Sequence, residues 1–147
     1  MRFLFLIVLL LANLPLRVSA EKCDNNAYKK NEKKLIGVSM TLKDAKKPCL
    51  ALETVFKDWR PCVDRFDSEG YNDAIAQVAS ERWEAVDELV VIKKRDPDFY
   101  KFVLAALSSD AIEVGRWKKI LDNLSKCPSS AKEICSDIKN ASTSKTH

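Results

Sequence analysis

The chain has 147 residues, of which 25 are lysine or arginine and 21 are aspartate or glutamate, and its net charge is +4. So small an excess of base gives no reason to expect nucleic acid or an anionic membrane as a partner. The sole histidine is the last residue, His147, which argues against a Ser–His or Cys–His nucleophile because a catalytic base must be held beside its partner. No phosphate-binding glycine loop and no CxxC pair occurs, so we expect no cofactor, no metal and no enzyme activity.

Residues 1–20 have the parts of a secretory signal peptide: a basic start, an apolar run from Phe3 to Ala12, and small residues before the expected cleavage point at Ala20. The alternative is a membrane anchor, but a span needs about 20 apolar residues. Pro15 and Arg17 interrupt this run too early. We therefore expect a soluble mature protein in the periplasm or outside the cell.

The remaining 127 residues are within the usual size of one domain, which we expect to cover residues 21–140. Residues 141–147 are small and polar and are expected to be disordered. Residues 21–47 hold eight lysines against four acids, whereas residues 53–98 hold twelve acids against seven bases. The acidic centre is interpreted either as the solvated sides of helices or as a surface for a basic partner.

Apolar residues recur at helical spacing along most of the chain, and nothing supports strands. Residues 21–47 predict one helix and a loop, with a short apolar cluster at Leu35, Ile36, Val38, Met40 and Leu42. The later stripes are Leu52, Val55, Phe56, Trp59, Val63 and Phe66; Ile75, Val78 and Ala79; Trp83, Val86, Leu89 and Val90; Phe99, Phe102, Val103, Ala106 and Leu107; Val114, Trp117, Ile120, Leu121 and Leu124; and Ala131, Ile134, Cys135 and Ile138. We interpret these stripes as core faces.

Capping residues and prolines mark the expected helix boundaries. Pro61 either kinks a helix or starts a second one, and Pro128 ends the helix before it. The expected helix starts are Asp96 followed by Pro97, Asp110 with Glu113, and Ser130 with Glu133. Short helices joined by tight turns predict an all-α fold, either an irregular antiparallel bundle or stacked helix pairs.

Five cysteines in an exported chain indicate disulfides, and their odd number leaves one thiol over or paired between chains. Cys127 and Cys135 lie eight residues apart across a helix break, and we expect them to be bonded. Continuous helix would hold Cys49 and Cys62 about 20 Å apart. A bond between them requires a chain reversal, and otherwise Cys23 pairs with one of the two.

The residues selected as a candidate partner-binding set are Trp59, Asp64, Asp67, Glu69 and Asp73. Each of the three tryptophans sits in an apolar stripe, but Trp59 has charged neighbours and a following proline, so it is the best candidate for exposure. An exposed tryptophan beside charges is typical of an interface hot spot. The acids that follow it are either caps in a turn between helices or contacts for a basic target.

The region from about Lys57 to Ile138 resembles small periplasmic helical proteins of bacteria. The resemblance centres on the segment from Asp96 to Leu104 and on the Cys127-Pro128…Cys135 ending. Some of those proteins are immunity proteins that neutralise toxins delivered by a type VI secretion system. The resemblance implies an all-helical fold and a protein partner, such as a cognate toxin or hydrolase whose active site is covered. It assigns no functional residue.

A second hypothesis is a secreted carrier of small hydrophobic ligands, as in insect odorant-binding proteins. Those proteins typically have six cysteines with one pair three residues apart, a pattern that this chain lacks.

Overall fold

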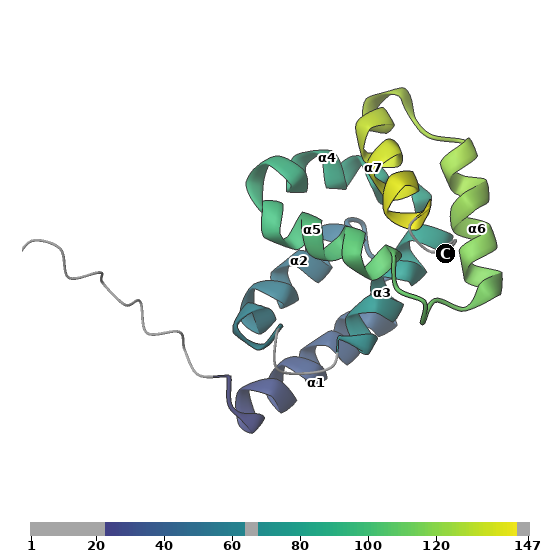
Figure 1. The fold of residues 1–147 in the computed structure, drawn as a ribbon. Coiled ribbons are helices and arrows are strands. Elements are labelled where there is room, and N and C mark those ends of the chain that lie inside the picture. Colours follow the sequence, from purple (N-terminus) through teal and green to yellow (C-terminus); the bar gives the residue numbers. More distant parts are fainter. Residues whose placement is uncertain (1–22, 64–67, 144–147) are drawn as a thin grey trace, which may run out of the picture.

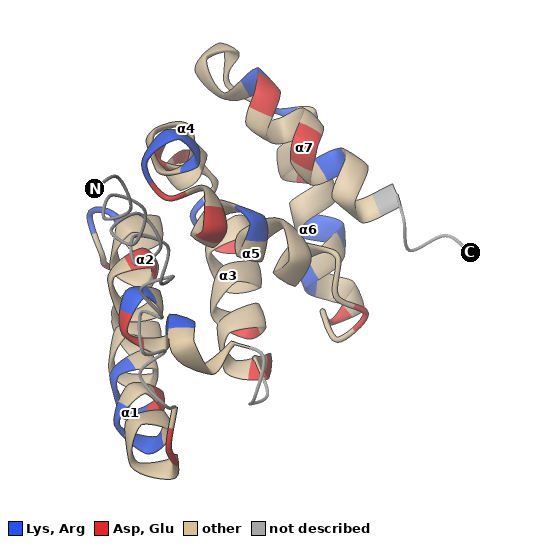
Figure 2. Cartoon of the chain, turned by 60° about the vertical axis from the view of Figure 1, so that its left-hand side comes forward, with Lys and Arg blue, Asp and Glu red and all other residues tan. Residues whose placement is uncertain are grey.

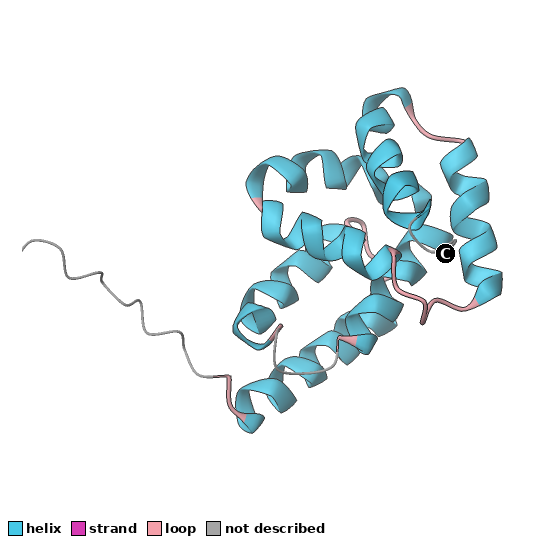
Figure 3. Ribbon diagram, in the orientation of Figure 1, coloured by secondary structure: helices cyan, strands magenta, loops and turns pink. Residues whose placement is uncertain are grey.

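The computed structural model describes residues 23–63 and 68–143, which form seven α-helices and no strand (Figures 1 and 3). The elements are α1 (Asn25–Thr41), α2 (Pro48–Trp59), the 3-10 turn η1 (Arg60–Cys62), α3 (Glu69–Glu81), η2 (Trp83–Ala85), α4 (Val86–Arg95), α5 (Pro97–Leu107), α6 (Val114–Ser125), η3 (Ser129–Ala131) and α7 (Lys132–Thr143). The all-α prediction is confirmed. Residues 1–20, and with them the expected signal peptide, lie outside the described part of the chain.

Helix α3 is the centre of the arrangement, because it contacts α1, α2, α5 and α6. The pair α1 and α2 forms one edge of the molecule, whereas α6 and α7 lie at the opposite side (Figure 1). Helices α4 and α5 pack on each other, and α5 also contacts α7. No helix among the described residues has the length and apolar character to cross a membrane.

Local chemistry explains several of the helix boundaries. The Asp24 side chain accepts hydrogen bonds from the backbone amides of Asn26 and Ala27, at 2.9 and 2.8 Å, and so caps α1. Asp96 accepts from the amide of Phe99 at 3.1 Å, and Pro97 is the first residue of α5, as its sequence predicted. The stripe that begins at Leu52 breaks after Trp59, where α2 ends and η1 turns the chain.

Three boundary predictions were wrong. Helix α6 begins at Val114 with Glu113 at the cap position and no side-chain capping bond, so Asp110 does not cap it. Ser130 lies in η3, and its hydroxyl donates to Asp87 at 2.6 Å instead of capping α7. Helix α7 continues to Thr143, three residues into the stretch that was expected to be disordered. The remaining residues of that stretch, 144–147, lie outside the described residues.

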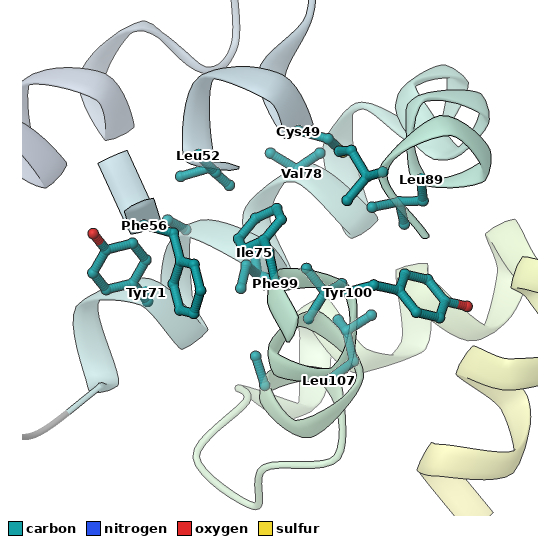
Figure 4. Close-up of a cluster of buried hydrophobic side chains, with 14 of the residues drawn as sticks. Cys49, Leu52, Phe56, Tyr71, Ile75, Val78, Leu89, Phe99, Tyr100 and Leu107 are labelled. Carbon is teal, nitrogen blue, oxygen red and sulfur yellow. The ribbon is translucent and has the colours of Figure 1, made fainter. Parts of the chain in front are cut away.

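The core joins α2, α3 and α5 through aromatic side chains. Figure 4 shows Phe56 lying between Tyr71 and Phe99, and the Phe56 and Phe99 ring centroids are 5.0 Å apart. Trp59 stacks on Tyr71 at 4.6 Å and meets Phe102 at 5.7 Å. Most residues of the predicted stripes are buried in this core or where α4, α6 and α7 pack on it. The prediction was wrong for Val114 and Leu121 of α6, which are exposed.

Two disulfides close the structure, Cys23–Cys62 and Cys127–Cys135. The second confirms the pairing predicted from the eight-residue spacing. The first shows which of the open alternatives holds: Cys23, just before α1, is bonded to the end of η1. Cys49 is left as a buried free thiol, because Pro48–Trp59 is one continuous helix that separates it from Cys62.

Arg82 holds the loop between α1 and α2. Its guanidinium donates to the carbonyl oxygens of Leu42, Lys43 and Ala45 at 2.9, 2.5 and 3.0 Å. One of these carbonyls belongs to Leu42, the C-cap residue of α1. Helix α1 has no basic residue in its own last turn, so Arg82 supplies a positive charge at its C-terminal end. Arg82 follows α3 directly, so these bonds fix the α1–α2 edge against the central helix.

A further polar link joins α4, α5 and α7. The Lys93 amine and the Tyr100 hydroxyl both donate to the Asp137 carboxylate, each at 2.7 Å. Lys93 also pairs with Glu133. The hydrogen bonds from Lys93 and then Tyr100 hold the pKa of Asp137 below its ordinary value.

This arrangement predicts a loss of stability in acid. A carboxyl whose pKa is lowered by folding stabilises the folded state at neutral pH, and that contribution disappears as the pH falls through the folded pKa. We expect the free energy of unfolding, measured with urea, to fall less between neutral pH and about pH 3 in Asp137→Asn than in the unsubstituted protein. An equal acid loss in both proteins would contradict the proposed role of Asp137.

Candidate binding surface

The structure describes Trp59, Glu69 and Asp73 of the predicted partner-binding set, and it does not expose all three. Trp59 is 2% exposed, so its predicted role as an exposed hot spot is wrong. Asp64 and Asp67 lie outside the described residues. Glu69 is exposed in the first turn of α3, and Asp73 lies one turn further along the same helix.

Asp73 pairs with Arg116 of α6, and this ion pair ties α6 to α3. Its charge is therefore partly neutralised within the molecule, which weakens the case for an acidic surface that meets a basic partner.

The burial of Trp59 has a simple helical explanation. Neighbouring residues on a helix point in different directions, so the exposed positions of Asp58 and Arg60 say nothing about Trp59. The informative signal was its spacing from Val55 and Phe56, which placed it on the core face.

An apolar cavity lies between α2, α3, α4, α5 and α7, bordered by Cys49, Phe99 and Trp83 among others. Its volume is about 30 Å³. Pockets for small molecules usually measure roughly 300–1,000 Å³, so the cavity is small for a carrier. Burial raises the pKa of the Cys49 thiol far above its ordinary value, and a thiol held neutral in this way is a poor nucleophile.

The outer face of α1 displays two of the large apolar side chains that are exposed among the described residues; the others are Val91 on α4 and Val114 and Leu121 on α6. Lys29, Lys33, Ile36 and Met40 follow one another at spacings of four, three and four residues, so they line one face of the helix. We call these four residues the α1 outer stripe. Ile36 is 54% exposed and Met40 is 80% exposed. Figure 2 shows α1 at the edge of the molecule, with lysines coloured blue along it.

The opposite face of α1 is anchored in the core. Leu35 is buried there, and so is the polar side chain of Asn31. The Asn31 amide donates to the carbonyl oxygen of Val55 at 3.0 Å, and its oxygen accepts from the Tyr71 hydroxyl at 2.8 Å. These buried bonds to α2 and α3 fix the rotation of α1 about its axis, so the outer stripe is held facing outward.

A groove of about 490 Å³ runs along the flank of α1 next to α2. Its lining residues are Cys23, Asp24, Ala27, Lys30, Asn31, Lys34, Lys57, Asp58, Pro61 and Cys62. Lys34 pairs with Asp58, and Lys57 pairs with Glu53. Asp24 is occupied as the cap of α1. Lys30 is thus the lining cation that has no ion-pair partner among the described residues.

This surface was not predicted, because the apolar cluster expected in residues 21–47 combined Ile36 and Met40 with Leu35 and Leu42. Helical spacing could have separated them. Asn31, Leu35, Val38 and Leu42 form one stripe, and the outer stripe lies on the other side of the helix.

The described residues also contain no cluster of side chains with metal-binding geometry, since no group of three or more His, Cys, Asp or Glu side chains among them is placed to hold a metal ion. Comparison of the chain with family models, with curated proteins and with solved structures gave no match.

Proposed function

We propose that this chain is an exported protein-binding domain of the immunity type, which neutralises a secreted toxin by covering its active site with a preformed surface. The observation that carries the proposal is the outward display of Ile36 and Met40 on a helix whose other face is locked in the core. The two disulfides support an oxidising destination, the periplasm or the cell exterior, because such bonds persist there.

Physical considerations favour binding at the α1 outer stripe. Large apolar side chains contribute about 25 cal/mol for each Å² removed from water, and methionine is enriched at protein interfaces. A surface that is already rigid loses little conformational entropy when it binds. Helix α1 meets this condition through Asn31, Arg82 and the Cys23–Cys62 disulfide.

The experiment first asks whether a gene for an exported hydrolase adjoins the gene for this chain, and then measures whether the chain protects cells that express that hydrolase as the candidate toxin. We expect the double variant Ile36→Asp/Met40→Asp to lose protection and to bind the purified toxin about 100-fold more weakly, because two carboxylates would be buried against the partner. The stability of the variant should change little, since both side chains are exposed.

Val91→Asp is the matched control. Val91 is 56% exposed, but it lies on α4 and not on the α1–α2 edge. It should keep full protection. Equal protection by the α1 double variant and the unsubstituted protein would overturn the proposal.

The second candidate is a carrier of small hydrophobic ligands, which the apolar lining of the internal cavity favours. At about 30 Å³ the cavity has to widen before it can hold such a ligand. Native mass spectrometry of the purified protein separates the two candidates: a co-purified lipid supports the carrier, and an unliganded mass supports the binding domain.

A further inference from the structure

We propose that the partner segment that docks on α1 is an acidic amphipathic helix, whose carboxylates contact Lys29, Lys30 and Lys33 and whose apolar side chains cover Ile36 and Met40. This inference rests on the proposed function and names the chemistry of the partner. An acidic partner is the opposite of the basic partner that the acidic centre of the sequence, residues 53–98, had suggested.

Charge complementarity is the first argument. Residues 23–47 contain seven lysines and three acidic residues. Lys34 and Lys57 are paired within the molecule, whereas Lys29, Lys30 and Lys33 form no ion pair with any described carboxylate. Three unpaired cations on adjacent turns create a local positive potential, which attracts an acidic segment and speeds its association.

The order of residues along α1 is the second argument. The lysines occupy the first half of the outer stripe, and the apolar side chains occupy the second half. Glu32, the acidic residue of α1, is exposed beside the stripe, three residues from Lys29 and four from Ile36, but the three lysines outnumber it on this part of the helix. A helix that lies along α1 therefore needs carboxylates at one end of its contact face and apolar side chains at the other. Docking of a helix along an exposed amphipathic surface is a common mode of recognition.

A membrane surface is the other occupant to consider. Helices that bind anionic lipid carry a long apolar face with lysines along its polar side, so that the whole length can lie in the interface. In α1 the opposite face is already buried in the core, and charge and apolar character are separated along the helix axis. This order fits a protein segment better than a lipid bilayer.

The test uses a synthetic helical peptide that carries glutamates in one half and leucines in the other half of a single face. Binding to the full-length mature protein is measured by fluorescence anisotropy, and the site is mapped by NMR shifts of backbone amides. We expect shifts in α1, and we expect affinity to fall as salt rises, because screening weakens exposed ion pairs. Lys30→Glu/Lys33→Glu should weaken binding about tenfold, since each reversal replaces an attraction with a repulsion.

The matched control is Lys118→Glu/Lys119→Glu on α6, which changes the net charge by the same amount. Both lysines are exposed, and neither forms an ion pair with a described residue. Binding by this control should equal that of the unsubstituted protein. Equal weakening in both double variants, no binding of the acidic peptide, or equal binding of a peptide with lysines in place of the glutamates would overturn the inference.

Vesicles of phosphatidylglycerol test the lipid alternative, and binding to them without peptide binding would also overturn the inference. Failure of this inference can be distinguished from failure of the proposed function by comparing the two double variants of α1. If Ile36→Asp/Met40→Asp abolishes protection against the toxin while Lys30→Glu/Lys33→Glu retains it, the domain binds its partner through α1 and the acidic partner is wrong.

Discussion

Replacement of Trp59 by alanine is expected to destabilise the whole domain, by about 3–5 kcal/mol, instead of removing a surface contact. Trp59 is 2% exposed, stacks on Tyr71 and contacts Phe56 and Phe102. Alanine would leave a cavity where α2, α3 and α5 meet. Urea unfolding followed by far-ultraviolet circular dichroism measures this loss as a lower denaturation midpoint.

Met40→Ala is the control for this prediction. Met40 is 80% exposed, and its truncation should change the free energy of unfolding by less than about 0.5 kcal/mol. The pair of variants also separates folding from binding, because Trp59→Ala should impair both and Met40→Ala should impair binding alone. A Trp59→Ala protein as stable as the unsubstituted one would show that the indole is not part of the core.

Removal of the Cys23–Cys62 disulfide is expected to cost about 4 kcal/mol, on the model in which a crosslink lowers the chain entropy of the unfolded state. The two cysteines are 39 residues apart in sequence. The double variant Cys23→Ala/Cys62→Ala should unfold at a much lower urea concentration, in the same assay. Since Cys23 immediately precedes the cap of α1, amide hydrogen exchange in α1 should also increase.

The second disulfide provides an internal comparison. Cys127–Cys135 spans only eight residues, and the same model gives about 2.5 kcal/mol for its removal. Its loss should leave hydrogen exchange in α1 unchanged, because it closes the turn between α6 and α7 at the other side of the molecule (Figure 1). A larger cost for Cys127→Ala/Cys135→Ala than for the long-range pair would contradict the chain-entropy account.

The candidate surface was less predictable than the fold, for an identifiable reason. The α1 sequence has apolar residues on two sides of the helix, and periodicity alone does not say which side other helices cover. The deciding contacts come from Val55 and Tyr71, which lie 24 and 40 residues away from Asn31 in sequence. No local pattern around Asn31 reveals that its side chain will form hydrogen bonds with the Val55 carbonyl oxygen and the Tyr71 hydroxyl.

Features that depend on near neighbours could be predicted without the fold: the helices, the start of α5 at Asp96 and Pro97, and the bond between Cys127 and Cys135. Capping, helical periodicity and the closure of short loops depend on residues that are close together in sequence. They can therefore be recognised from the sequence alone.

Long-range packing is needed to explain the burial of Trp59, the bond between Cys23 and Cys62, and the outward display of Ile36 and Met40. Each of these depends on which distant segment covers a given helix face. That choice results from the packing of all seven described helices at once.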